Sequence, residues 1–153
     1  MTTAHTLAAG ATAEAATAAA TRERGATVWL TGLPSAGKST LARAVAERLA
    51  AAGRRAEVLD GDEVRRFLSQ ELGFTREDRH TNVTRIGFLA QTLASHGVLV
   101  LAPVIAPYAA SRAAVRARHA AGGTEYLEVH VATPVQVCSV RDVKGLYAKQ
   151  AAG

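Results

Sequence analysis

The chain has 153 residues, 48% of them hydrophobic and 20% charged, which is the composition of one globular domain with a buried core. Its net charge of +5 comes from 15 Arg and 3 Lys against 13 acidic residues. This basic balance suits binding of a nucleotide, but a genome rich in Arg and Ala codons explains it equally well. Because the chain has no Lys/Arg runs and few aromatic residues, we expect no nucleic-acid partner. The single cysteine, Cys138, excludes an intramolecular disulfide, and without a membrane-length apolar run or a signal-peptide pattern we expect a cytoplasmic protein with no membrane partner.

The first 24 residues are mostly Ala and Thr, with few large apolar side chains. Such a segment buries too little apolar surface to offset the entropy lost on ordering. Because alanine favours helix, a frayed helix over about 11–23 is the alternative to an irregular arm. We therefore expect an N-terminal arm over 1–24 and a folded domain over 25–153.

A glycine-rich stretch, GLPSAGKS at 32–39, follows a predicted strand at 26–31 and opens a predicted helix that runs to about Ala52. It fits the pattern G-x-x-x-x-G-K-[ST] at every fixed position. Glycines let successive N–H groups turn toward an anion, and the helix N-terminus adds partial positive charge. In such loops the lysine, here Lys38, reaches nucleotide phosphates, and the hydroxyl, here of Ser39, ligates Mg²⁺. The alternative is a chance glycine-rich turn, and the flanking strand and helix argue against it.

Two carboxylates follow a second short strand, predicted at 56–59. They lie in the sequence Asp60-Gly61-Asp62, and a helix over about 62–70 comes next, with Asp62 as its expected N-cap. Functional groups of α/β proteins gather where parallel strands end. The pair therefore indicates metal or proton chemistry, and a plain turn with a helix cap is the alternative.

The next loop carries an aromatic residue, Phe74, directly after a glycine, which is a poor position for a core side chain. An exposed aromatic there suits stacking on a nucleobase. Thr75 and Asp78 then have the spacing of a capping box, which predicts a long helix to about His96.

The strongest continuous apolar run, 98–105, predicts a central parallel strand that is buried on both faces and ends near Pro103. Further along we predict a helix, a strand and a helix, over about 108–121, 126–131 and 133–140. The polar residues 141–153 are predicted to form a mobile segment.

The predicted order β-α-β-α-α-β-α-β-α is typical of an α/β fold in three layers, a parallel sheet with helices on both faces. The three candidate stretches, 32–39, 60–62 and 105–108, all follow the C-terminal ends of predicted strands. Ligand sites of such sheets form at that edge.

Taken together and in this order, several stretches resemble the adenylylsulfate kinase family. They are GLPSAGKST at 32–40, LDGDEVR at 59–65, LGFTREDR at 72–79, Asn82, RIG at 85–87, IAPY at 105–108 and VRDVKGLY at 140–147. The resemblance covers roughly residues 25–151 and implies a P-loop kinase fold over 25–153, with 141–153 as a mobile lid. It implies an ATP-dependent phosphotransferase that uses MgATP on the ribose 3′-hydroxyl of adenosine 5′-phosphosulfate, giving 3′-phosphoadenosine 5′-phosphosulfate for sulfate assimilation or activation.

On the donor side, the resemblance implies an ATP site that includes Arg141 and the loop residues Gly32, Leu33, Pro34, Ser35, Ala36, Gly37, Lys38, Ser39 and Thr40. Lys38 would neutralise phosphate charge, and Ser39 would ligate the Mg²⁺ that accompanies ATP. Asp62 is our choice as the general base, and Asp60 would organise the metal's waters; residue chemistry alone leaves the reverse assignment open.

On the acceptor side, Phe74 would pack on the substrate adenine, and Arg65 and Arg79 would pair with the phosphosulfate. The remaining substrate-binding residues implied are Asp62, Asn82, Ile105, Ala106 and Lys144, of which Ile105 and Ala106 would contribute backbone groups.

The sequence departs from the family in two places. Some members carry a serine, proposed as a phosphorylated intermediate, where this chain has Ala106, so we expect direct in-line transfer. The family pattern continues beyond the lid, whereas this chain stops at Gly153, so we expect a truncated C-terminal end. Another small-molecule P-loop kinase and a catalytically impaired nucleotide-binding homologue therefore stay as alternatives, and a homodimer is the oligomer considered.

Overall fold

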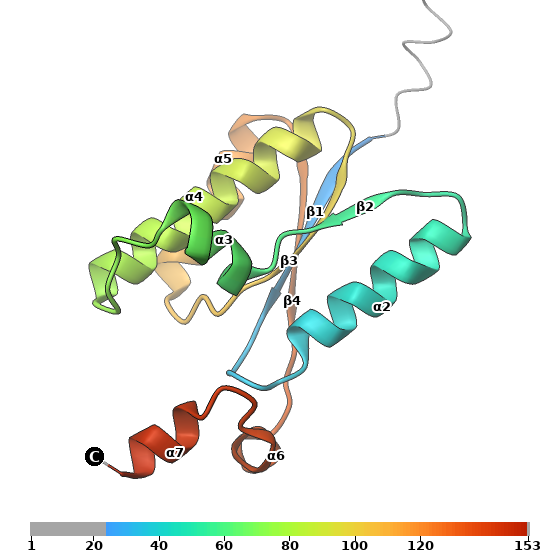
Figure 1. Ribbon diagram of the computed structural model, residues 1–153. Coiled ribbons are helices and arrows are strands. Elements are labelled where there is room, and N and C mark those ends of the chain that lie inside the picture. The colour runs from blue at the N-terminus through green and yellow to red at the C-terminus, as the bar shows by residue number, and fades with distance from the viewer. Residues whose placement is uncertain (1–23, 153) are drawn as a thin grey trace, which may run out of the picture.

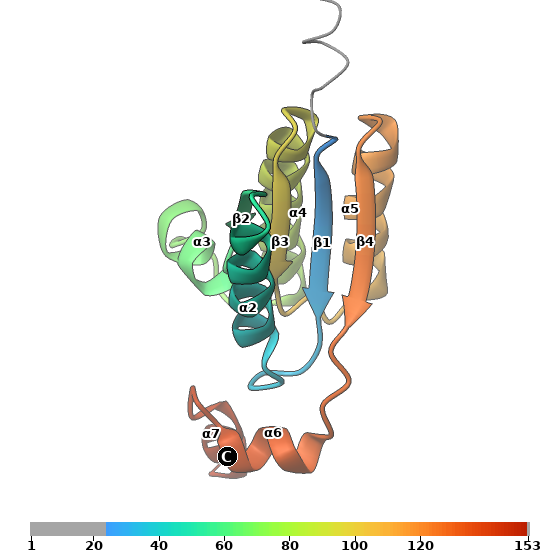
Figure 2. The ribbon, with the colours of Figure 1, turned by 90° about the vertical axis from the view of Figure 1, so that its right-hand side faces the viewer.

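A four-stranded sheet organises the computed structural model, which describes residues 24–152. The predicted arm over 1–24 lies outside the described residues, apart from Arg24. The strands are β1 (Ala26–Thr31), β2 (Ala56–Val58), β3 (Leu99–Pro103) and β4 (Glu125–His130). They are all parallel, in the order β2-β3-β1-β4, so their C-terminal ends meet at one edge (Figure 2).

Burial explains the two central strands. The last four residues of β3 are all buried, and β1 is nearly as apolar, as expected for strands covered on both faces. In the β1–β3 register, Leu30 pairs with Pro103. β3 ends at this proline because proline has no N–H group to donate to the ladder of hydrogen bonds. β4 is the outermost strand beside β1, and the exposure of its side chains alternates. Its last residue, His130, pairs with Thr31, so β1 and β4 end at the same level of the sheet.

Helices cover both faces of the sheet. Figure 1 shows α2 (Lys38–Ala51) on one side, and α4 (Arg76–Ser95) with α5 (Ala109–Ala121) on the other. The short helix α3 (Gly61–Leu68) follows β2, and α6 (Val135–Arg141) and α7 (Leu146–Ala151) lie beyond the C-terminal ends of the strands. This confirms the three-layer α/β prediction. Among the described residues, no helix has the length and apolar character that a membrane span requires.

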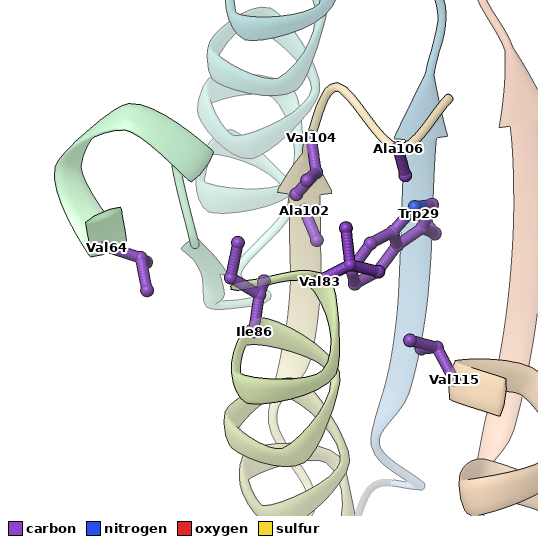
Figure 3. Packing of buried hydrophobic residues seen from close by; sticks show 8 residues of the cluster. All are labelled: Trp29, Val64, Val83, Ile86, Ala102, Val104, Ala106 and Val115. Atoms are coloured by element: carbon purple, nitrogen blue, oxygen red, sulfur yellow. The ribbon is translucent and has the colours of Figure 1, made fainter. Parts of the chain in front are cut away.

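The main core lies between the sheet and the α4–α5 pair. Trp29 on β1 is fully buried and packs with residues of α4, α5 and β3 (Figure 3). The two helices pack closely at Gly87, where a Cβ atom would come within 2.6 Å of Val115 Cγ2. A hydrogen side chain at this position therefore sets how close α5 can pack on α4.

Two sequence-based details were wrong. The N-cap of α3 is Asp60 and not Asp62, because the Asp60 carboxylate accepts from Asp62 N at 3.0 Å. The predicted order of elements ended with the helix over about 133–140, whereas the structure has a further helix, α7, which Gly145 begins in the left-handed region at φ 65°. Asp142 stabilises its first turn by accepting from the backbone N–H groups of Tyr147 and Ala148 at 3.1 and 2.9 Å.

Candidate functional site

A cavity of about 1050 Å³ opens at the C-terminal edge of the sheet. We call it the sheet-end cavity. Its walls come from the glycine-rich loop and α2, from the start of α3, from the loop before α4, and from segments after β3 and β4. The lining residues that the sequence predicted are Pro34, Ser35, Ala36, Gly37, Lys38, Ser39, Thr40, Asp60, Asp62, Arg65, Phe74, Arg79, Asn82, Ile105, Arg141 and Lys144.

The glycine-rich loop has the backbone of an anion-binding turn. Gly37, at φ 97°, is the N-cap of α2, and Gly32, at φ 143°, leaves only 2.7 Å between a Cβ atom and the Val131 carbonyl oxygen. Ser35 also adopts a left-handed conformation, with φ 59°, which is uncommon outside glycine. These three positions turn the loop so that its N–H groups can face a phosphate group.

Lys38 lies under this loop. Its ammonium group donates to the carbonyls of Gly32 and Leu33 at 3.0 and 2.7 Å, and the residue is buried. Gly32 and Leu33 thus contribute to the site by holding the Lys38 ammonium group. Neither is among the described residues that line the cavity. Burial, followed by repulsion from Lys144, lowers the pKa of Lys38 to about 8. A buried ammonium group held in place by two carbonyls is positioned to donate to phosphate oxygens.

Asp60 connects the donor loop to α3. Its carboxylate accepts from Ser39 Oγ at 2.7 Å as well as from the backbone of Asp62, and Arg43 Nη2 lies 3.8 Å away. Burial acts to raise the pKa of Asp60, but the hydrogen bonds from Ser39 and Asp62 outweigh it, so the pKa lies below its usual value and the group is ionised. A serine hydroxyl beside a carboxylate is an oxygen donor set that suits Mg²⁺, which takes few protein ligands and otherwise keeps phosphate oxygens and waters.

Asp62 has a different environment. It forms an ion pair with Lys144 from the segment after α6, and both side chains are substantially exposed. The carboxylate faces the cavity from the first turn of α3 and holds no structural hydrogen bond of the kind that fixes Asp60. Asp62 therefore has a carboxylate that a ligand can reach, whereas Asp60 is engaged in the fold.

Phe74 projects from the loop before α4 and is 72% exposed, as the sequence predicted. Both predicted arginines lie against its ring, with the guanidinium carbons 4.5 Å (Arg65) and 5.6 Å (Arg79) from the ring centroid. Arg65 also donates to the carbonyls of Leu72 and Gly73 at 2.6 and 2.5 Å, and Arg79 Nε donates to the Phe74 carbonyl at 3.0 Å. In this state both arginines brace the aromatic loop.

Asn82, at the end of the second turn of α4, is 8% exposed and lines the cavity. Its Oδ1 is one of two buried side-chain polar atoms without a hydrogen-bond partner among the described residues. Since buried polar atoms are normally paired, this oxygen is free to bind a ligand donor.

The turn after β3 contributes one of its two predicted residues. Ile105 lines the cavity, but Ala106 is not among the described residues that do so. Ala106 is buried in the main core (Figure 3). Its carbonyl accepts from Arg112 Nη1 at 2.7 Å. A helix arginine thus already uses the Ala106 carbonyl in this structure, and the contribution of an Ala106 backbone group to substrate binding stays a prediction.

Sequence reasoning missed three residues at this site. Arg43 follows Ser39 by four positions, one turn along α2, a spacing that could have placed it on the same face. Thr133 has no such signal, and Tyr147 is marked only by its place in the family-like stretch 140–147; both reach the glycine-rich loop from over 90 positions away in the chain. Tyr147 Oη donates to the Pro34 carbonyl at 3.1 Å, and Thr133 Oγ1 donates to the Ala36 carbonyl at 2.8 Å.

A parallel sheet, a glycine-rich loop between β1 and α2, and a buried lysine beneath that loop define a P-loop kinase fold. A sequence profile described as adenylylsulphate kinase matches residues 24–153. The chain belongs to the adenylylsulfate kinase family.

Individual relatives agree with this assignment. The adenylyl-sulfate kinase of Myxococcus xanthus (strain DK1622) is 55% identical over 132 residues, which are 86% of this chain and 71% of the relative. That of Synechococcus sp. (strain JA-3-3Ab) is 55% identical over 130 residues, 85% of this chain and 72% of the relative. Among solved structures, the Mycobacterium tuberculosis APS kinase CysC in complex with AMPPNP and APS superposes with a TM-score of 0.83 at 48% identity, covering 86% of this chain and 76% of that one.

Proposed function

We propose that this chain is an ATP-dependent adenylylsulfate kinase. It transfers the γ-phosphoryl group of ATP to the ribose 3′-hydroxyl of adenosine 5′-phosphosulfate, and it releases ADP and 3′-phosphoadenosine 5′-phosphosulfate. The observation that carries the proposal is one cavity lined by a phosphate-binding loop on one side, and by Phe74 and the unpaired Asn82 oxygen on the other. A donor nucleotide and an acceptor nucleotide would then meet over Asp62.

On the donor side, the loop N–H groups and Lys38 would hold the ATP phosphates. Ser39, supported by Asp60, would hold Mg²⁺, which supplies charge neutralisation across the phosphates. The short Ser39–Asp60 hydrogen bond and the ionised state of Asp60 support this assignment. Arg141 would add positive charge near the loop, since its Nη1 lies 3.8 Å from the position of a Cβ atom on Gly37.

On the acceptor side, Phe74 would stack on the adenine, and Asn82 Oδ1 would accept a hydrogen bond from the substrate. Arg79 and Arg65 would turn from the Phe74 ring toward the phosphosulfate. Asp62 would take the proton of the 3′-hydroxyl, because its carboxylate is accessible whereas that of Asp60 is held by Ser39 and by the start of α3. Lys144 would leave Asp62 as the acceptor hydroxyl arrives.

Transfer would be direct. Ala106 has no hydroxyl group and is buried away from the cavity, so no phosphorylated enzyme is expected at this position. Residues 25–153 would form the kinase domain, with 141–153 as the lid over the cavity. A cytoplasmic location would match the reduced state expected for the single cysteine.

The deciding experiment measures ADP release with MgATP, with and without adenosine 5′-phosphosulfate. Stimulation by that substrate is expected, together with a radiolabelled 3′-phosphorylated product from γ-labelled ATP. ATP binding without stimulation would refute the proposal, and stimulation by a different alcohol would assign another small-molecule kinase. A labelled phosphoenzyme in a single turnover would contradict direct transfer.

A further inference from the structure

Three consecutive residues of the glycine-rich loop contact the chain that follows β4. The Pro34 carbonyl accepts from Tyr147 Oη at 3.1 Å, Ser35 Oγ accepts from Val143 N at 3.2 Å, and the Ala36 carbonyl accepts from Thr133 Oγ1 at 2.8 Å. These contacts bridge 97 to 113 positions of sequence. The loop that would hold ATP phosphates is thus also bonded to the segment that would form the lid.

Ser35 is an unusual residue for its place. Its φ of 59° lies in the left-handed region, where glycine is favoured and a side chain costs energy. A serine at such a position persists when the surrounding structure makes use of it. Here its hydroxyl accepts the backbone N–H of Val143, next to Lys144.

Tyr147 fixes the other end of the same short segment. Its hydroxyl reaches Pro34, and its backbone N–H donates to Asp142 Oδ1 at 3.1 Å, so the start of α7 and the turn at 142–145 move together. The Gly145 N–H donates to the Asp142 carbonyl at 2.9 Å and closes that turn. Between the two attachment points lies Lys144, the residue paired with Asp62.

We propose that Ser35 and Tyr147 are positioning residues that latch the lid onto the phosphate-binding loop, so that Lys144 and Arg141 are held over the cavity. The inference rests on the proposed function for its consequence in catalysis, but the latch itself is a property of the protein without substrate. Neither side chain needs to touch the reacting atoms. Loss of the latch lowers the fraction of molecules whose lid is in place.

The test compares Ser35→Gly and Tyr147→Phe with matched controls. Glycine accepts the positive φ, so Ser35→Gly removes the hydroxyl and leaves the loop backbone in place. Tyr147→Phe removes one oxygen and keeps the ring. The controls are Ser139→Ala, whose hydroxyl bonds locally within α6 to the Gln136 carbonyl, and Tyr108→Phe, which keeps the ring that faces Arg76.

Two measurements report on the lid without any turnover. Residue-resolved hydrogen exchange follows the Val143 N–H, and limited trypsin digestion with mass spectrometry follows cleavage after Lys144. Because a hydrogen bond contributes modestly, each latch variant should speed the Lys144 cleavage by about 3- to 10-fold, and Ser35→Gly should do the same to Val143 exchange. The double variant should be cleaved after Lys144 faster than either single variant. Its fold increase should be smaller than the product of the two single fold increases, because both bonds hold one segment. The controls should match the wild type, and the thermal midpoint should be unchanged in all.

Kinetics then connect the latch to the reaction. We expect kcat to fall by a similar factor of about 3 to 10, while the KM for adenosine 5′-phosphosulfate stays within about twofold, since Phe74 and Asn82 are not on the lid. Unchanged exchange and cleavage in both latch variants would overturn the latch, whatever the enzyme's activity. Faster exchange and cleavage in a protein that never turns over adenosine 5′-phosphosulfate would uphold the latch and refute the proposed function.

Discussion

Asp60 and Asp62 are two residues apart and have the same side chain, yet their surroundings assign them different tasks. Asp60 accepts from Ser39 and begins α3, and these bonds keep it ionised. Asp62 pairs with the exposed ammonium of Lys144 and faces the cavity. A group held by the fold suits metal support, and a group open to substrate suits proton transfer.

Replacing each carboxylate by its amide separates these roles. Asp62→Asn should lower kcat by about 10²- to 10⁴-fold, the usual contribution of a general base, and leave the thermal midpoint unchanged. Asp60→Asn should instead raise the Mg²⁺ concentration needed for half-maximal activity, because a neutral amide supports the metal at Ser39 less well than a carboxylate does. Single-turnover rates and magnesium titrations measure both effects. Equal losses of kcat with no change in magnesium dependence would contradict the assignment.

Phe74 offers a second test at the scale of one residue. Removing one stacking face costs about 1–3 kcal/mol, so Phe74→Ala should raise the KM for adenosine 5′-phosphosulfate by roughly 5- to 150-fold with ATP affinity unchanged. Phe67→Ala is the matched control, since Phe67 is 75% exposed on α3 and is not among the described cavity residues. Similar KM values for the two variants would contradict a role for Phe74 in stacking on the substrate.

At the scale of the elements, α4 packs on α5 over one face of the sheet, and the start of α4 lies at the cavity. Thr75 begins α4 with a capping box completed by Asp78, so the helix start is fixed next to Phe74 and Asn82. The contact between Gly87 and Val115 then sets the distance between the two helices.

Gly87→Ala should therefore destabilise the protein despite the better helix propensity of alanine. The new methyl group would meet Val115 Cγ2 at 2.6 Å, and overpacking costs about 1–3 kcal/mol against roughly 1 kcal/mol gained in propensity. Denaturant unfolding measures the loss. The double variant Gly87→Ala/Val115→Ala should lose less stability than the sum of the two single losses, because the smaller side chain at 115 makes room for the new methyl group, and strict additivity of the two changes would contradict the steric explanation.

At the scale of the whole molecule, the donor site works against stability. A cation buried beneath the loop has a pKa of about 8 in the fold, below the value of 10.5 for a free lysine. Between these values the unfolded chain binds more protons than the folded chain, so the free energy of unfolding rises with pH through this window. The charged lysine is thus kept for phosphate binding and not for folding.

The prediction compares wild type with Lys38→Met at pH 7.5 and pH 10. The wild type should gain about 1–3 kcal/mol of unfolding free energy relative to the variant over that interval, because only it releases a buried proton. Urea unfolding at both pH values gives the difference. A constant gap between the two proteins would show that Lys38 is not desolvated in the fold.

Local patterns in the sequence determined a large part of this protein. Periodicity and turn chemistry predicted the strand that ends near Pro103, the strand at 26–31 and the capping box at Thr75. They also predicted the order of the elements up to α6, and the structure confirmed all of these. The exposed Phe74 and the cavity positions of Lys38, Asp62 and Asn82 also agree with the predictions. Each of these features depends on neighbours within one element, or on the rule that parallel strands end at one edge.

Only the tertiary structure decided what the side chains bind. It assigned the α3 cap to Asp60, the Ala106 carbonyl to Arg112, and the arginines to the Phe74 loop. It also formed α7 and brought Tyr147 to Pro34 and Val143 to Ser35. These contacts join residues whose partners depend on how the chain packs in space, and hydrogen-bonding capacity alone does not specify which of several carbonyls or hydroxyls a donor will reach.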